Sequence, residues 1–417
     1  FNAQSLSLTA WAFATAGHAT WALFGAISTE VVRRGLREFN AQSLSLTAWA
    51  FATAGQATQA LFGAISAEVV RRGLREFDAQ NISNTAWAFA TVGDAPRAIF
   101  GAISAEVACR GLRDFKPQEL SNTAWAFATV GHAPQALFGA ISTEVVRRGL
   151  REFNTQNISN TAWAFATVGH AAQALFGAIS DELVHRELSD FNAQNLSNTV
   201  WAFATAGHAT QALVEAISSE VVRRGLSDFN AHDLSNTAWA FAVFDPPSAD
   251  ELFDSASFTT RCANLESSFS SKSLSQLHQW SIWRKERRAL WTGLPEALRQ
   301  ACRNAFVEEE GQPSQLQSDV VREIRSRRFK VEEEHRCEAS GYSIDALVTL
   351  NDARRIAVEV DGPSHFVGRS HQPTGATVLK HRQLRHFGWH LEIVLYWEWD
   401  SGSRELHWLP RSPSGSP

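Results

Sequence analysis

The sequence predicts an α-solenoid of 38-residue helix-pair repeats followed by a small α/β module. The first observation behind this prediction is that a phenylalanine and a tryptophan recur every 38 residues, always in the same phase, through residues 1–244. A unit of this length cannot bury its apolar face alone, so a fixed period predicts stacked helical repeats. The second observation is that the hydrophobic pattern shortens towards a period of two after residue 328, which is typical of strands.

Composition excludes several other classes of protein. The chain has 417 residues, of which 44% are hydrophobic and 19% are charged, and its formal net charge is −5, which suits two or more domains. Its four cysteines are scattered, so neither a disulfide framework nor a zinc knuckle is indicated. No stretch approaches the 18 or so consecutive apolar residues of a membrane span. The mild acidity argues against indiscriminate polyanion binding but allows a local basic face.

The beginning of the chain falls in register with the repeats. Methionine is absent, and Phe1 is the first position of a repeat. We therefore expect a fragment, with a targeting segment and further repeats upstream of it.

Each repeat is predicted to form two helices. In the third repeat, Ile82 and Phe89 belong to one apolar stripe, and Gly93 stands where a left-handed C-cap is expected. A second stripe begins at Ile99 and is closed by Gly111. Six full repeats and half of a seventh fill residues 1–244.

The face opposite the apolar stripe of each first helix carries amides and an indole. Gln80, Asn84 and Trp87 share this face in the third repeat, whereas the first two repeats have Leu8 and Leu46 in place of the asparagine. Amides offer donors and acceptors to base edges, and an indole offers a stacking plane, so we expect this face to bind single-stranded RNA. Alternatively, the tryptophans pack between repeats and the asparagines bond neighbouring backbone. The candidate RNA-binding residues are Gln80, Asn84, Trp87, Gln118, Asn122, Trp125, Gln156, Asn160, Trp163, Asn198, Trp201 and, in the C-terminal module, His365.

Pairs of arginines close several of the second helices. Cations at this end favour the helix dipole, and a row of them would also suit phosphates. Both interpretations remain open for Arg33-Arg34, Arg71-Arg72, Arg147-Arg148 and Arg223-Arg224.

The pattern after the repeats predicts four further segments. They are a serine-rich linker at 245–275, a helical cap or spacer at 276–327, the α/β module at 328–410 and a disordered tail at 411–417. Together with the helix at 314–327 that precedes it, the module is expected to have the order helix, three strands, helix, strand.

Acidic residues interrupt the apolar strands of this module. Glu359 and Asp361 share one face of their strand, and Asp345 lies on the preceding strand. Three converging carboxylates suit a hard cation such as Mg²⁺, and Lys380 would orient water or stabilise a phosphate, so these four residues are candidates for catalysis and the three acids for metal binding. Alternatively, the acids cap the following turn and pair with nearby cations such as Arg354, Arg355 or His365.

Two resemblances give these patterns a function. The repeat, with Asn-Thr before Trp-Ala-hydrophobic-Ala, resembles the octotricopeptide repeats of organelle RNA-maturation factors and the repeats of FAST-kinase-like mitochondrial proteins. VEVDGPSHF, PTGATVLKHRQLRHFGW and LYWEWD are similar to the RAP domain of organellar RNA-processing proteins, whose layout resembles the restriction-endonuclease-like fold.

The resemblance implies an organellar RNA-binding protein that acts in rRNA or mRNA processing, maturation or stability, in mitochondrion or chloroplast. Its partners would be single-stranded RNA and ribonucleoprotein or ribosome-assembly factors, with no membrane and no cofactor required for binding. One alternative is a metal-dependent endoribonuclease that uses Mg²⁺. The nuclease pattern places a lysine two residues after the second acid, but Asp361 stands there, so Lys380 would have to substitute for it. A third alternative is an α-solenoid scaffold that binds proteins.

Overall fold

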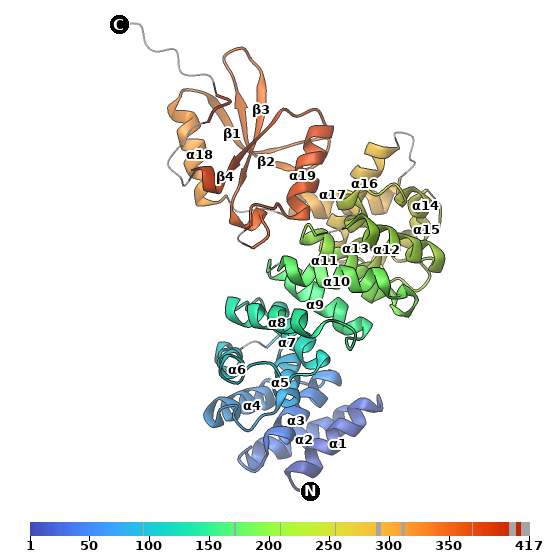
Figure 1. Cartoon of the computed structure of the whole chain (residues 1–417), viewed down its shortest axis with the longest axis vertical. Helices are drawn as coiled ribbons and strands as arrows, with labels where there is room; N and C mark the ends of the chain where they lie inside the picture. Colours follow the sequence, from blue (N-terminus) through green and yellow to red (C-terminus); the bar gives the residue numbers. More distant parts are fainter. Residues whose placement is uncertain are drawn as a thin grey trace. The chain divides into compact units, whose positions relative to one another are not determined.

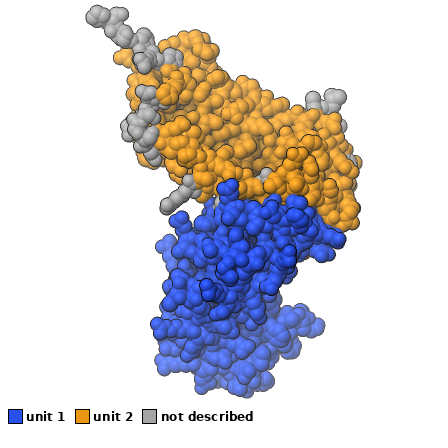
Figure 2. Space-filling model, in the orientation of Figure 1, with its two compact units in different colours: residues 1–191 blue, residues 192–417 orange. Residues whose placement is uncertain are grey.

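The computed structural model describes residues 1–94, 96–170, 172–208, 210–254, 256–288, 293–309, 313–368, 370–399 and 406–409. The chain folds as two compact units, Phe1–Phe191 and Asn192–Pro417 (Figure 1, Figure 2). The predicted solenoid of residues 1–244 therefore extends through the first unit into the second. The predicted tail at 411–417 lies outside the described residues.

The first unit consists of helix pairs in the predicted 38-residue register. Its first helices pack directly on one another from repeat to repeat, and its second helices form a looser outer layer. The helices are α1 (Ala3–Thr15), α2 (Trp21–Arg34), α3 (Ala41–Thr53), α4 (Gln59–Arg72), α5 (Ala79–Thr91), α6 (Arg97–Arg110), α7 (Pro117–Thr129), α8 (Gln135–Arg148), α9 (Thr155–Thr167) and α10 (Gln173–His185), followed by the short η1 (Leu188–Asp190).

Local sequence sets both ends of these helices. Asn40 caps α3 by accepting a hydrogen bond from the backbone N–H of Ser43 at 2.8 Å. Gly93, predicted as a left-handed C-cap, has a φ of 70°, which confirms the prediction, and Gly111 ends α6 with a φ of 77° and an extended ψ of −177°.

The second arginine of a pair joins the end of its repeat to the start of the same repeat and to the residues just before it, as Arg72 does with Phe39, Leu36 and Arg37. Arg72 donates to the carbonyl oxygen of Phe39 at 2.6 Å and to the carboxylate of Glu68 at 2.6 Å. Arg186 repeats the backbone contact with Phe153 at 2.7 Å. The first arginine stays at the surface, as Arg71 does, and pairs with the same glutamate. The second, inner arginine therefore has a structural role, because its guanidinium is bonded to the glutamate and to a backbone carbonyl.

The second unit continues the repeats and ends in a four-stranded sheet. No helix within the described ranges is long and apolar enough to cross a membrane. Its elements are α11 (Ala193–Thr205), α12 (Gln211–Arg224), α13 (Ala231–Phe244), α14 (Ala249–Phe253), α15 (Ala256–Asn264), η2 (Glu266–Ser268), α16 (Ser271–Arg287), α17 (Glu296–Glu308), α18 (Gln315–Ser326), β1 (Lys330–Arg336), β2 (Ser343–Thr349), β3 (Arg355–Asp361), η3 (Pro363–His365), α19 (Gly375–His386), β4 (Leu391–Leu395) and α20 (Tyr396–Glu398).

The predicted linker at 245–275 is wrong, because most of this segment is helical. Phe253 and Phe258 are buried, and their rings pack against Trp280 of α16. Arg261 donates to the carbonyl oxygen of Phe229 at 3.0 Å, which is the contact that the inner arginines make in earlier repeats. Helices α14 and α15 thus complete the seventh repeat, and α16 packs on α13 as the first helix of an eighth would.

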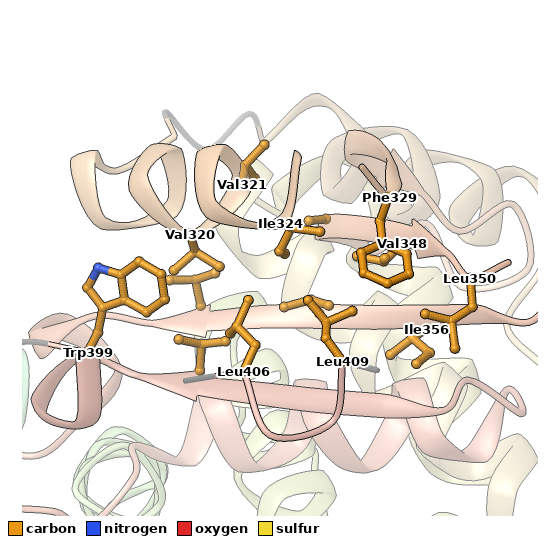
Figure 3. Packing of buried hydrophobic residues seen from close by; sticks show 14 residues of the cluster. Val320, Val321, Ile324, Phe329, Val348, Leu350, Ile356, Trp399, Leu406 and Leu409 are labelled. Carbon is orange, nitrogen blue, oxygen red and sulfur yellow. The ribbon is translucent and has the colours of Figure 1, made fainter. Parts of the chain in front are cut away.

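The sheet has the order β1-β2-β3-β4, with β3 and β4 parallel and the other neighbours antiparallel. One face is covered by α18, whose Val320 and Ile324 point toward the strands (Figure 3). Helix α18 therefore belongs to the module and not to the predicted spacer at 276–327. We call residues 315–409 the RAP-like module; its predicted order of strands and helices is confirmed.

The other face of the sheet carries α19, which also packs on the repeat helices of the same unit. Gln383 of α19 donates to the carbonyl oxygen of Gln279 in α16 at 2.8 Å. Tyr342 donates to Gln383 and accepts from the Gln279 side chain, both at 2.8 Å. Because these polar groups satisfy one another within a buried contact, they fix α19 between the sheet and the repeats.

Candidate functional site

Three consecutive repeats of the first unit present the same polar surface on α5, α7 and α9. The glutamines are exposed, and the asparagines and tryptophans are half-buried. Among the described residues, no hydrogen-bond partner is found for any of the six amide side chains, so their donors and acceptors are available to a ligand. We call this surface the amide–tryptophan row: Gln80, Asn84, Trp87, Gln118, Asn122, Trp125, Gln156, Asn160 and Trp163.

The tryptophans of the row contact one another from repeat to repeat. The ring centroids of Trp87 and Trp125 lie 6.4 Å apart, as do those of Trp125 and Trp163, with interplanar angles of 32° and 33°. The rings thus pack between repeats, as one interpretation of the sequence expected. They also keep part of their surface open, as the other interpretation requires, so packing and RNA contact are compatible roles.

The predicted row does not stay open in the sixth repeat. Asn198 is 9% exposed and Trp201 is 8% exposed, so the structure buries these two candidate RNA-binding residues. The ammonium of Lys272 lies 5.4 Å from the centroid of the Trp201 ring. The difference arises because Lys272 of α16 lies over the ring and α19 packs on α11, and the 38-residue pattern predicted neither contact.

In the RAP-like module, strands β2 and β3 and helix α19 bring three of the four predicted catalytic residues together. The ammonium nitrogen of Lys380 lies 2.5 Å from Oε2 of Glu359 and 4.0 Å from Oδ1 of Asp345. Asp345 also accepts a hydrogen bond from the backbone N–H of Val360 at 2.7 Å.

Asp361 does not join the Lys380 cluster and contacts two histidines instead. Its Oδ1 lies 2.9 Å from Nδ1 of His365 and 3.5 Å from Nε2 of His381. Burial opposes ionisation of Asp361, but hydrogen bonds from the two histidines outweigh it and lower its pKa to about 2. This carboxylate therefore anchors the turn after β3, as the structural interpretation of the sequence proposed.

Burial dominates the charge state of the Lys380 cluster. It raises the pKa of Glu359, whose side chain is 0% exposed, to about 8, and it also raises the pKa of Asp345. Burial alone would lower the pKa of Lys380, but the carboxylates of Glu359 and Asp345 raise it. Glu359 therefore loses its proton only at a higher pH than an exposed glutamate does, and its carboxylate is then paired with the Lys380 ammonium.

The cluster borders an open pocket of about 460 Å³. Asp345, Lys380 and the candidate RNA-binding residue His365 line it, whereas Glu359 lies behind them. Sequence reasoning missed Glu334 and Arg336, which bring further charges to its wall. Strand alternation could not identify these two residues, because the backbone of β1 is irregular at Glu334, which has a φ of 50°. The Glu334 carboxylate accepts hydrogen bonds from the side chains of Gln317 and Ser343, both at 2.7 Å.

The donor set does not fit the predicted magnesium site. Within the described residues, no three His, Cys, Asp or Glu side chains are grouped so as to hold a metal ion. The Lys380 ammonium occupies the place between Glu359 and Asp345, and Asp361 turns to its histidines. The three carboxylates predicted to bind a metal therefore form a lysine-centred ion cluster and a separate acid–histidine cluster.

The buried carboxyl of Glu359 predicts a pH dependence of local stability. Because its pKa is about 8 in the folded protein and 4.5 ordinarily, the folded state binds more protons between these values. Stability is therefore expected to fall as pH rises from 6 to 8, by about 2 kcal/mol at ~1.4 kcal/mol per pH unit. Amide hydrogen exchange of strand β3 measures this directly. Glu359→Gln should flatten the dependence, and a variant as pH-dependent as the wild type would contradict the assignment.

Comparison with known proteins supports the division into repeats and module. The RAP domain family model matches residues 358–406, which include α19, β4 and the contact between Glu359 and Lys380. A model described as a protein of unknown function (DUF1601) matches residues 58–85, 143–161 and 181–200, all within or beside the helical repeats. The C-terminal module thus carries a RAP domain, a kind of module usually linked to RNA binding.

One curated relative is the "RAP domain-containing protein, chloroplastic" of Oryza sativa subsp. japonica, 31% identical over 96 residues. The match covers 23% of this chain and 14% of the rice protein, so the chain spans about a seventh of that relative's length. Among solved structures, an engineered protein is similar with a TM-score of 0.35 and 16% identity, over 78% of this chain and 90% of that one.

Proposed function

We propose that this protein binds single-stranded RNA along the amide–tryptophan row and acts in the maturation or stability of organellar rRNA or mRNA. The observation that carries the proposal is the row itself, in which unpaired amides stand beside partly open indoles on three successive repeats. Stacking and amide contacts suit a chain of net charge −5, because they do not depend on a strongly basic surface.

The carboxyl-terminal module supports the same proposal. It matches the RAP domain, and its pocket combines Arg336, Lys380 and His365 with carboxylates. Cations beside hydrogen-bonding groups suit a phosphate and its neighbouring sugar. The rice relative is named chloroplastic, and on this ground we propose an organelle as the place of action. Ribonucleoprotein or ribosome-assembly factors would be the protein partners there.

Replacing Trp125 with alanine is expected to weaken RNA binding by a factor of about 5 to 150, because one lost stack costs about 1 to 3 kcal/mol. The measurement is fluorescence anisotropy of a labelled single-stranded 20-mer pool, with the helical circular dichroism spectrum recorded in parallel.

A matched control is available in the same unit. Trp21 is 73% exposed and begins a second helix, away from the row, so Trp21→Ala removes an equally large ring without touching the proposed surface. Equal RNA affinity in the two variants, or loss of helical structure in Trp125→Ala with unchanged affinity, would favour a purely structural role for the tryptophans.

A further inference from the structure

The row is chemically uniform over its three repeats. Each of α5, α7 and α9 presents an exposed glutamine, a half-buried asparagine and a half-buried tryptophan, followed by an exposed threonine at Thr91, Thr129 and Thr167. The tryptophan rings advance by the same 6.4 Å in both steps. Three surfaces with the same groups, in the same setting and at the same spacing must prefer the same partner.

The two repeats before the row share a different surface. Their glutamine, tryptophan and threonine are kept, but Leu8 and Leu46 replace the asparagine. Leucine has no donor or acceptor, so these repeats lack one of the two amides that bond a base edge. Leu8 is 44% exposed, and Trp49 of the second repeat still contacts Trp87, with centroids 6.1 Å apart. The row of contacting rings therefore extends into the second repeat, while both repeats offer fewer hydrogen bonds to a base.

From this pattern we infer that the protein recognises a run of three identical nucleotides in single-stranded RNA, next to two positions at which any base is accepted. The inference rests on the proposed function, and it adds the class of RNA sequence. Helical-repeat proteins that bind one base per repeat select that base with two or three side chains. With the same side chains three times in succession, selection of three different bases would have no chemical source.

The spacing of the rings agrees with one nucleotide per repeat. Stacked bases in one strand lie about 3.4 Å apart, so a strand whose bases are partly unstacked can advance by the 6.4 Å between neighbouring rings with each nucleotide. An amide with one donor and one acceptor can pair with an edge of several bases, so the binding assay identifies the base. The number of identical positions follows from the repeats.

The test uses the full chain and labelled 12-mer RNAs in which only the three central nucleotides carry bases. Four RNAs carry AAA, CCC, GGG or UUU, and a second set changes one base of each triplet in turn. We expect one uniform triplet to bind about tenfold tighter than each of its singly changed forms, whichever of its three positions is altered.

Two exchanges between the repeats test the assignment from opposite sides. Asn122→Leu gives the middle repeat the residue that Leu8 and Leu46 already provide in this fold. In this variant, a change of the central base should lower the RNA affinity less than twofold, while a change at either outer position should still lower it about tenfold. Leu46→Asn should add a fourth selective position, so that a uniform quadruplet gains about tenfold over a triplet followed by a different base.

The outcomes separate the inference from the proposed function. If the wild type binds the random 20-mer pool but binds every uniform and mixed triplet equally, the inference is overturned and RNA binding stands. If position selectivity does not follow the Asn122→Leu and Leu46→Asn exchanges, the inference is also overturned. If neither the pool nor any 12-mer binds, the proposed function fails, and the inference fails with it.

Discussion

Replacing Arg284 with alanine is expected to destabilise the end of the repeat stack by about 3 kcal/mol, because a buried charge network loses its central member. The Arg284 side chain is 0% exposed. It donates to Asp250 at 3.0 Å and also to Asp254. Its guanidinium lies 5.6 Å from the centroid of the Trp283 ring, so the substitution also removes aromatic contact and leaves a cavity.

The consequence should be local to the seventh and eighth repeats. Asp250 lies in α14, which is only five residues long and is held to α16 by these ion pairs. Amide hydrogen exchange of residues 249–264 in the full chain is therefore the most direct measurement. We expect protection there to fall sharply while the helices of the first unit keep theirs.

A neighbouring arginine provides the control. Arg288 pairs with the same two aspartates, at 3.4 and 3.0 Å, but its side chain is 52% exposed. Exposed pairs are worth about 0 to 1 kcal/mol, so Arg288→Ala should be close to neutral. Equal effects of the two substitutions would show that burial of Arg284 contributes nothing to the stability of the stack.

This network also explains why part of the fold could not be predicted from the sequence. The 38-residue period identified the repeats because Phe, Trp and Gly recur at fixed positions, and each performs the same packing or capping role. After Asp245 the 38-residue period is lost, and serines stand where apolar residues identify the earlier repeats. What holds α14 and α15 there is a set of long-range contacts, such as Arg284 with Asp250, that no local pattern encodes.

The candidate site residues also fall into two groups, those placed by a local pattern and those whose contacts depend on long-range packing. Helical periodicity placed Gln80, Asn84 and Trp87 on one face, because that argument depends only on the angle between successive residues. It could not predict that Trp201, at the same repeat position, is buried under a later segment. Strand alternation likewise placed Glu359 and Asp361 on one face. Their different partners, Lys380 and the histidines, depend on how α19 packs on the sheet.

Gly375→Ala is expected to separate α19 from the repeat helices and to cost about 3 kcal/mol. A Cβ atom at this position would lie 2.0 Å from the carbonyl oxygen of Ala204 in α11. No side chain can yield there, because the obstacle is backbone, so the helix itself must shift. Intrinsic helix propensity favours alanine over glycine by about 1 kcal/mol, so any loss of stability must come from the contact.

The shift would also break the polar contacts that join the module to the repeats. Arg382 donates to the carbonyl oxygens of Ala242 and, at 3.2 Å, of Val243, and Gln372 donates to that of Gly207. Hydrogen exchange of residues 375–386 should rise, and the thermal transition of the module should move to lower temperature. Gly362→Ala is the matched control, since no atom lies within 4 Å of its added Cβ. A Gly375→Ala variant as stable as this control would contradict the packing described for α19.

Gly375→Ala also tests whether the amide–tryptophan row or the RAP-like module selects the base. The amide–tryptophan row lies in the first unit, and the pocket with Lys380 and His365 lies in the second. Separating α19 from α11 and α13 disturbs the module and leaves α5, α7 and α9 unchanged. If the row supplies the sequence preference, Gly375→Ala should keep its preference among the triplet RNAs. Loss of that preference would place base selection in the RAP-like module, because only the module's contacts have changed.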